Sequence, residues 1–440
     1  MYTKYVGRSC PGLHYALHFL SAKCHRYSAA TSLAQDPPNT LSCPPPAPTT
    51  PHIPHIHFDK DPRAPAPPAS PPMAAAAAST GNGSPPVGLL VLMVLALAAG
   101  WFANAVRPPP PTPCGAPGGP PVTAPRVRMR DGRFLAYAES GVSRDGARFK
   151  VVYSHGFSGS RMDSPRASQA LLEELGVYMV AFDRAGYGES DPDPRRSLES
   201  AALDIQDLAD ALDLGDKFHL ICSSLGCHAG WASVKYIPHR LAGVAMMAPV
   251  INYRWSGLPR GLARQLYRRQ PLGDQWSLRV AYYAPWLLHW WMSQPWLPTS
   301  TVVSGSGSFP NALDEKNRLM ALSTGMFQKR AQAATQQGGQ ESFYRDMAVM
   351  FGRWPEFEPT DLGEAPPFPV HLFQGDEDGV VPVQLQRHIC RRLGWVGYHE
   401  LAGVGHFLSA VPGLGDRIIG TLLPGPAGNS STAAGSVCAY

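Results

Sequence analysis

Short apolar runs alternate with helical periodicity from Val127 onward, and this alternation limits the possible folds more than any other feature of the chain. The runs of strand length cover residues 151–153, 177–182, 218–222, 244–248 and 370–373. Between two of them, apolar residues recur at i, i+3, i+4 and i+7, as on one face of a helix: Ile205, Leu208, Ala209 and Leu212. Strands and helices that alternate in this way form a mostly parallel sheet flanked by helices. The sequence therefore predicts an α/β fold.

Residues 251–362 interrupt this alternation with Trp-rich helical sequence, and the strand pattern returns at Val370. A helical cap inserted into an α/β core explains the interruption, so we expect the core to comprise residues 126–250 and 363–424. The chain has 440 residues, of which 44% are hydrophobic, so it can bury one large core beside accessory sequence. The formal net charge is only +5 and no Lys/Arg run occurs, which argues against nucleic acid as a partner.

The N-terminal residues 1–86 are rich in Pro, Ala, Ser and Thr, and the final residues 425–440 are mostly small. Runs of proline neither pair as strands nor continue a helix, so we predict that both segments are disordered. The alanine run after Met73 is typical of a protein start. The residues before it are therefore either a transit sequence or an extension of the gene prediction.

Residues 87–106 are dominated by Leu, Val and Ala and are long enough to span ~30 Å of hydrocarbon as a helix. We predict a single transmembrane helix, followed by a Pro-rich linker at 107–125 that serves as a stiff spacer. Arginines after the span place the folded domain on the cytosolic side if translation starts at Met73. The alternative is a signal peptide that ends at Ala103-Asn104-Ala105, which would make the protein secreted or organellar.

Only three of the 8 cysteines, Cys222, Cys227 and Cys390, lie inside the predicted folded part. The others precede or follow it, so the cysteines do not suggest a disulfide framework. This distribution favours a reducing compartment.

A candidate nucleophile follows the strand at 218–222. Residues 222–226 read Cys-Ser-Ser-Leu-Gly, which is G-x-S-x-G with Cys in place of the first Gly, and helical sequence follows. A sharp strand-to-helix turn of this kind holds a serine hydroxyl clear of its surroundings. Ser224 is the predicted nucleophile because only it has a glycine two residues on, and Ser223 is its rival. The alternative is an ordinary turn without chemistry.

A serine hydroxyl needs a general base, and the base needs an orienting carboxylate. No Asp or Glu occurs between Asp216 and Asp274, so the carboxylate must come later in the chain. The loop Gly375-Asp376-Glu377-Asp378 follows a predicted strand, at the end of the sheet where such folds place their sites. Asp378 is the predicted orienting acid, while its two acidic neighbours are interpreted as exposed loop residues.

The predicted base is His406, which ends the loop Gly403-Val404-Gly405-His406 after a strand at 398–401. The glycines of this loop allow it to deliver the imidazole to the serine. An isolated histidine in such a loop is more often a surface or packing residue. With both partners in sequence order, we favour catalysis.

Acyl transfer also needs N–H groups that meet the negative oxygen of the tetrahedral intermediate. The N–H of Leu225 is one predicted donor, because Leu225 follows the nucleophile. The second is the N–H of Phe157, in the loop after strand 151–154, where Gly156 permits a close approach of the backbone. We expect His155 to brace this loop.

Taken in order, these motifs resemble the α/β-hydrolase superfamily. The resemblance rests on 154–157 (Ser-His-Gly-Phe), 183–190 (Asp-Arg-Ala-Gly-Tyr-Gly-Glu-Ser), the elbow at Ser224, 375–382 and Gly405-His406. It covers about residues 125 to 424 and is nearest to plant α/β-hydrolase proteins with an N-terminal hydrophobic segment and an esterase or lipase-like site. The cysteines at 222 and 227 depart from the usual elbow, a difference that concerns the rate of the reaction more than the fold.

The expected function is a serine hydrolase that cleaves a carboxylic ester through an acyl-enzyme on Ser224. The tryptophans of the cap and the apolar N-terminal segment favour a lipid or another hydrophobic small molecule as substrate, although the same tryptophans are also typical of cap packing. Two alternatives use the same residues: a ligand-binding or scaffold protein with little turnover, and an acyltransferase. No metal or organic cofactor is expected, because no His/Cys cluster has ligand spacing. The oligomeric state is not predicted.

Overall fold

A computed structural model describes residues 87–353 and 356–424 of the chain. All of these residues belong to one compact unit of the chain. The disorder predicted for residues 1–86 and 425–440 therefore concerns segments outside the described residues.

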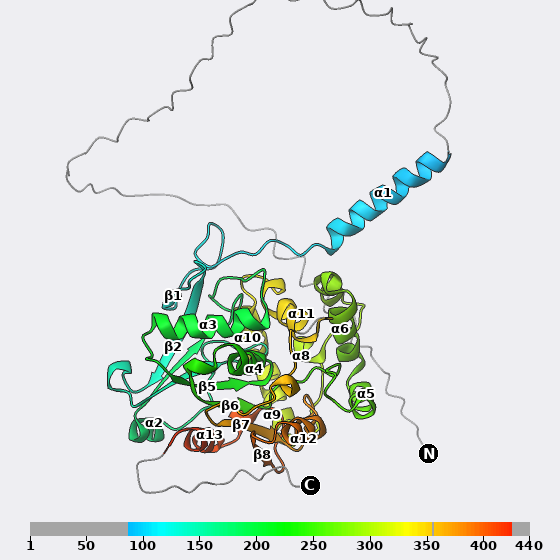
Figure 1. The fold of residues 1–440 in the computed structure, drawn as a ribbon. Helices are drawn as coiled ribbons and strands as arrows, with labels where there is room; N and C mark the ends of the chain where they lie inside the picture. The colour runs from blue at the N-terminus through cyan, green and yellow to red at the C-terminus, as the bar shows by residue number, and fades with distance from the viewer. Residues whose placement is uncertain (1–86, 354–355, 425–440) are drawn as a thin grey trace, which may run out of the picture. The chain divides into compact units, whose positions relative to one another are not determined.

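An eight-stranded sheet lies at the centre of the described chain, in the order β1-β2-β4-β3-β5-β6-β7-β8 (Figure 1). The strands are β1 (Arg126–Arg128), β2 (Phe134–Gly141), β3 (Phe149–Ser154), β4 (Val177–Phe182), β5 (Phe218–Ser223), β6 (Leu241–Met247), β7 (Val370–Gly375) and β8 (Gly397–Leu401). All pairings from β4 to β8 are parallel, whereas β1 with β2 and β2 with β4 are antiparallel. The predicted α/β fold with a mostly parallel sheet is confirmed.

Apolar residues on both strand faces explain the parallel pairing, because both faces of a parallel sheet are covered. All six residues of β4 are buried. In β3, Val151 and Tyr153 pack into one apolar cluster while Val152 packs into the other. The sequence analysis does not predict β2, a strand that mixes buried and exposed residues and pairs antiparallel with its neighbours.

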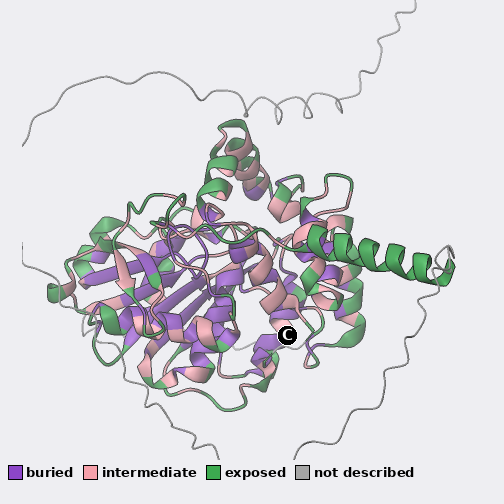
Figure 2. Ribbon diagram, turned by 90° about the horizontal axis from the view of Figure 1, so that it is seen from above, coloured by how far each residue is buried: buried purple, intermediate pink, exposed green. Residues whose placement is uncertain are grey.

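Helices cover both faces of the sheet, and Figure 2 shows buried residues concentrated along the strands. One face carries α3 (Leu198–Ala211), α4 (Cys227–Tyr236) and α12 (Val383–Arg392). The other carries α2 (Gln169–Leu175) and α13 (Leu414–Leu422). Short helical turns lie at η1 (Arg144–Gly146), η2 (Ser224–Gly226), η3 (Pro238–Arg240), η6 (Pro359–Asp361) and η7 (Leu408–Ala410).

Between β6 and β7 the chain forms a helical insert, which we define as α5 to α11 with their connecting loops. Its elements are α5 (Arg260–Arg269), α6 (Leu272–Tyr283), η4 (Pro285–Leu287), α7 (Leu288–Ser293), α8 (Thr301–Ser304), α9 (Ala312–Ser323), α10 (Met326–Ala334), η5 (Gln340–Tyr344) and α11 (Arg345–Phe351). Val280, Leu288 and Met347 of the insert share a small apolar cluster, against which Phe157 of the core packs. The insert therefore contacts the loop that follows β3.

The predicted apolar span is a helix, α1 (Val87–Val106), with the expected bounds. It is long and apolar enough to cross a membrane, with a mean hydropathy of 2.2. The segment after α1, predicted to be a stiff spacer, makes hydrogen bonds to the folded domain. Cys114 is buried and its N–H donates to Gln337 Oε1 at 3.1 Å, while the N–H and hydroxyl of Thr123 both donate to Glu189. This segment therefore packs against the folded domain.

Candidate active site

Ser224 stands at the turn between β5 and α4, at the carboxyl end of a central strand. Its backbone φ of 49° is in the left-handed region, which residues other than glycine rarely adopt. A Cβ atom at Gly226 would lie 2.1 Å from the carbonyl oxygen of His155, so only glycine fits two residues after Ser224. The turn is therefore held tightly against the loop after β3.

A disulfide bond flanks this turn, although the cysteine distribution does not suggest a disulfide framework. Cys222 at the end of β5 and Cys227 at the start of α4 are disulfide-bonded, with Cα atoms 5.0 Å apart. The sharp turn causes this proximity, because it reverses the chain within five residues. Both cysteines are fully buried, so the bond ties the residues on either side of Ser224 together inside the core. Such a bond does not suit the reducing compartment that the cysteine distribution favours.

The structure brings Ser224, His406 and Asp378 together from three separate loops. Ser224 Oγ lies 2.9 Å from His406 Nε2, and His406 Nδ1 lies 2.8 Å from Asp378 Oδ2. A carboxylate only accepts hydrogen bonds, so Nδ1 carries the proton and Nε2 faces the serine as an acceptor. This is the tautomer in which a histidine can take the proton of a serine hydroxyl.

The Asp378 carboxylate is buried and surrounded by donors. Its Oδ1 accepts the N–H groups of Val380 and Val381 at 2.8 Å each, and its Oδ2 accepts the side-chain amide of Gln374 at 2.9 Å as well as His406. These fixed donors hold the carboxylate in one orientation. The carboxylate in turn orients the imidazole ring of His406 through its bond to Nδ1.

The charge of Asp378 also sets the basicity of His406. Burial alone would lower the pKa of the imidazole, but Asp378, with a smaller contribution from Asp314, outweighs burial and raises this pKa above its usual value of 6.5. The ring is therefore a stronger base than a free histidine.

The two predicted oxyanion donors lie on either side of the elbow. Leu225 is buried in η2 directly after Ser224. The loop after β3 approaches the serine closely, since a Cβ atom at Gly156 would lie 3.2 Å from Ser224 Cβ. Within residues 87–353 and 356–424, the N–H of Phe157 has no hydrogen-bond acceptor. That N–H is therefore free to bind a ligand oxygen.

The buried ring of His155 hydrogen-bonds both to this loop and to the backbone after β4. Its Nε2 accepts the backbone N–H of Arg184 at 3.1 Å, so its Nδ1 carries the proton and donates to Gly156 O at 2.8 Å. Burial, and then the charge of Arg184, keep the pKa of His155 well below its usual value, so the ring stays neutral. The bracing role expected for His155 remains a proposal, but these contacts fit it.

Residues 151–413 match the model of a family described as the alpha/beta hydrolase family. The chain belongs to this family. Among solved structures, this alpha/beta hydrolase is similar to a thermophilic esterase from Thermogutta terrifontis, with 19% identity over 67% of this chain and 94% of that chain and a TM-score of 0.43. It is also similar to an esterase from Rhodococcus sp. (17% identity, 67% and 94% covered, TM-score 0.42) and to a hydrolase from Pseudomonas aeruginosa (18% identity, 67% and 98% covered, TM-score 0.45). A comparison with curated proteins finds no match.

The insert of this alpha/beta hydrolase contributes a carboxylate that the sequence reasoning missed. Asp314, in the first turn of α9, is buried and accepts the backbone N–H groups of His406 and Phe407, the latter at 3.2 Å. Asn311 caps the same helix and donates to Glu377 Oε2 at 2.7 Å and to Gly403 O at 3.0 Å. The start of α9 therefore bonds to both the loop that carries Asp378 and the loop that carries His406. The Asn-x-x-Asp pattern indicates a helix start, but nothing local in it indicates these contacts.

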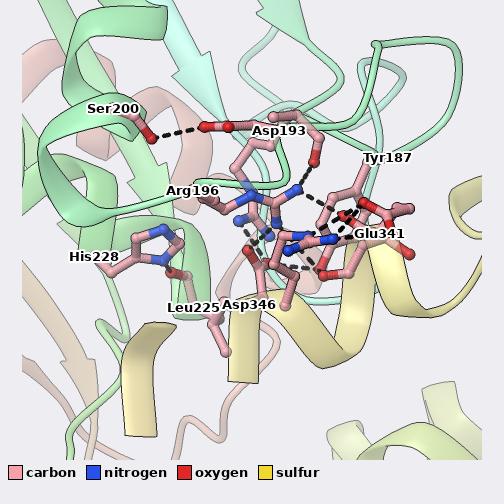
Figure 3. Close-up of polar contacts among 12 residues, drawn as sticks. Tyr187, Asp193, Arg196, Ser200, Leu225, His228, Glu341 and Asp346 are labelled. Atoms are coloured by element: carbon pink, nitrogen blue, oxygen red, sulfur yellow. Dashed lines mark hydrogen bonds and ion pairs between the residues drawn. The ribbon is translucent and has the colours of Figure 1, made fainter. Parts of the chain in front are cut away.

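A second insert carboxylate of the alpha/beta hydrolase lies in a buried network of charges (Figure 3). Asp346 of α11 has no exposed surface and binds Arg184 at 2.6 Å, Arg196 at 2.7 Å and the Tyr187 hydroxyl at 2.6 Å. Burial would raise the pKa of Asp346, but the two guanidinium groups hold it below its usual range. The carboxylate is therefore ionised, and it connects the insert to the segment 184–196 of the core.

No cluster of three or more His, Cys, Asp or Glu that could hold a metal ion occurs among the described residues of this alpha/beta hydrolase. The neutral histidines of the core make structural contacts. His228 in α4, for example, bonds the carbonyl of Leu225 and has its pKa lowered to about 4 by burial.

Proposed function

We propose that this protein is a serine hydrolase that cleaves a carboxylic ester. The observation that carries the proposal is the hydrogen-bonded series Ser224 Oγ–His406–Asp378, at 2.9 and 2.8 Å, on a turn where Ser224 adopts a left-handed conformation. Such a backbone conformation is costly and is retained at sites where the geometry is used. Membership of the alpha/beta hydrolase family agrees with this chemistry.

The proposed reaction begins when Ser224 Oγ attacks the acyl carbon while its proton passes to His406 Nε2. The negative oxygen of the tetrahedral intermediate accepts hydrogen bonds from the N–H groups of Phe157 and Leu225. The protonated imidazole, stabilised by Asp378, then gives the proton to the departing alcohol, and the acyl group remains on Ser224. A water molecule then gives a proton to His406 Nε2 and attacks the acyl-enzyme. His406 returns this proton to Ser224 Oγ as the acid leaves, which restores the serine hydroxyl.

A fluorophosphonate probe tests this proposal directly, because it reacts with an activated serine and stays attached. We expect the full chain to be labelled, and peptide mass spectrometry to place the label on Ser224. Folded protein that is not labelled would instead support a ligand-binding or scaffold protein. Labelling with product formed only when an alcohol acceptor is added would support an acyltransferase.

The pH dependence of ester hydrolysis tests the proposed base. Only neutral His406 can take the serine proton, so kcat/KM should rise with pH and reach its half-maximal value above pH 6.5, because the pKa of His406 is raised. Below that midpoint the rate should fall about tenfold per pH unit. Asp314→Asn removes one nearby negative charge and should move the midpoint down. A midpoint at or below 6.5 in the unaltered protein would contradict this assignment.

We further propose that the insert acts as a cap and that the substrate is hydrophobic, with α1 anchoring the chain in a membrane. Phe102, near the end of α1, contacts Trp286 and Trp290 of the insert, with ring centroids 6.2 and 6.4 Å apart. Trp286 and Trp296 are more than half exposed. Exposed tryptophans beside the end of an apolar helix suit the interface between lipid and water, where such rings concentrate.

Two charges in the middle of α1 should release the protein from membranes. Leu92→Arg together with Leu95→Arg introduces two cations, each of which costs roughly 2.5–3.5 kcal/mol at the centre of a span. The full chain should resist extraction by alkaline carbonate, and the double variant should be extracted. Leu319→Arg, at an exposed site on α9, is the control and should leave membrane attachment unchanged. A shortened soluble chain that begins after Ala105 would show a cleaved signal peptide instead.

A further inference from the structure

The peptide group between Gly156 and Phe157 is held from its carbonyl side by three donors. Gly156 O accepts Nδ1–H of His155 at 2.8 Å, the N–H of Gly159 at 3.2 Å and Nη2 of Arg184 at 3.4 Å. The N–H on the other side of the same peptide group is the free N–H of Phe157. Donors on a carbonyl polarise the peptide group and strengthen the hydrogen bond that its N–H can give. The Phe157 N–H is therefore both fixed in direction and strengthened as a donor.

Arg184 differs from the other two donors because it brings a full positive charge. Its side chain is nearly fully buried, and Nε also donates to His155 O at 3.0 Å, so one guanidinium spans two successive carbonyls of the loop. A rigid guanidinium suits this arrangement, since it presents several donors in a fixed plane. The guanidinium carbon of Arg184 also lies over the ring of Tyr187, 4.6 Å from the ring centroid.

The charge of Arg184 needs a buried partner, and the insert supplies it. Asp346 binds Arg184 through Nη1 at 2.6 Å, and the same carboxylate binds Arg196 and Tyr187 (Figure 3). The side chain of Arg196 is buried to a similar extent and also binds Asp346. Its other hydrogen bonds go to the carbonyls of Ala185, Glu341 and Ser342. No bond joins Arg196 to residues 155–157 in the described chain. The two arginines therefore share a charge environment, and only one of them reaches the loop.

We propose that Arg184, held in place by Asp346 of the insert, is a positioning residue that fixes and polarises the Phe157 N–H as an oxyanion donor. This inference rests on the proposed function, in which that N–H meets the negative oxygen. It assigns a role in transition-state stabilisation to the contact between insert and core. Arg184 stabilises the oxyanion through the peptide group and makes no contact with the substrate.

Two variants of the full chain, Arg184→Gln and Arg196→Gln, separate this role from simple structural support. Both remove one buried positive charge from Asp346. With 4-nitrophenyl butyrate as substrate, Arg184→Gln should lower kcat about tenfold or more while KM changes little, because the donor acts mainly in the transition state. Arg196→Gln should leave kcat within about threefold of the unaltered enzyme. Equal losses in the two variants, or a loss confined to KM, would overturn the proposal.

Binding of phenylboronic acid adds a readout that loss of stability does not move. The boronate forms a tetrahedral adduct on Ser224, and one of its oxygens occupies the oxyanion position. Its inhibition constant should weaken in Arg184→Gln by the same factor as kcat, and should be unchanged in Arg196→Gln. An unchanged constant in folded Arg184→Gln would contradict the proposal.

Arg184→Lys keeps the positive charge beside Asp346 and replaces the forked donor, so it tests the proposal even if Arg184→Gln does not fold. The same losses in kcat and boronate binding are expected, and values equal to those of the unaltered enzyme would overturn the proposal. Failure of the proposed function gives a different result. In that case the unaltered protein itself would neither hydrolyse the ester nor bind the boronate.

Discussion

Replacement of Ser224 by alanine is expected to lower kcat for ester hydrolysis by at least ~10³-fold and to abolish fluorophosphonate labelling. The reason is that Ser224 Oγ is the atom 2.9 Å from the acceptor nitrogen of His406, and alanine leaves no nucleophile there. The fold should not suffer, because a methyl group replaces a partly buried hydroxymethyl group. Steady-state kinetics on 4-nitrophenyl butyrate, with circular dichroism as the check on folding, give the measurement.

Ser223→Ala is the matched control, since Ser223 is the adjacent hydroxyl and ends β5. The side chain of Ser223 interacts with buried Tyr153. Within the described residues, Ser223 makes no hydrogen bond to His406. We expect its kcat to stay within about threefold of the unaltered protein. Loss of activity and labelling in Ser223→Ala, with Ser224→Ala active, would move the nucleophile to the neighbouring serine.

Replacement of Asp378 by asparagine is expected to lower kcat by ~10⁴-fold with little change in shape. The carboxylate now receives Val380 N–H, Val381 N–H, the Gln374 amide and His406 Nδ1–H. With Oδ1 still satisfied by the two backbone groups, the amide would present an NH₂ group to His406. The imidazole would then carry its proton on Nε2, the wrong nitrogen for a base that faces Ser224.

Asp376→Asn tests whether this loss is specific to one carboxylate of the loop. Asp376 accepts the N–H of Gly403 at 2.8 Å, and an asparagine oxygen accepts the same bond. Its kcat should therefore remain within about threefold of the unaltered value. If the Asp376 variant lost activity and the Asp378 variant kept it, the orienting carboxylate would be assigned to Asp376.

The sequence predicted those parts of the structure that local pattern determines. The bounds of β4 and α1 follow from continuous apolar runs, and the position of Ser224 follows from a strand, a turn with glycine and a helix. Asp378 and His406 could be singled out because each ends a loop after a strand of a parallel sheet, where the carboxyl ends of strands meet. The sequence does not give the distances among Ser224, His406 and Asp378, which come from the structure.

The parts that the sequence reasoning missed depend on contacts between residues far apart in the chain. Asp314 lies 92 residues from His406, and Asp346 lies 150 residues from Arg196. In the sequence, each is an ordinary acidic residue in the first turn of an insert helix, and acidic residues are common at that position. The Cys222–Cys227 bond was missed for another reason, because the pairing depends on the shape of the turn, in which Ser224 adopts a left-handed conformation.

The bonds from Asp314 and Asp346 to the core limit how this enzyme can be rebuilt. A graft that exchanged the whole insert for that of another hydrolase would take both carboxylates away. The loop of His406 and the guanidinium of Arg184 would then be left with unpaired groups, however well the new insert fitted the substrate. The insert is thus not an interchangeable module for substrate choice. Redesign of the proposed cap should therefore keep Asn311, Asp314 and Asp346 in place.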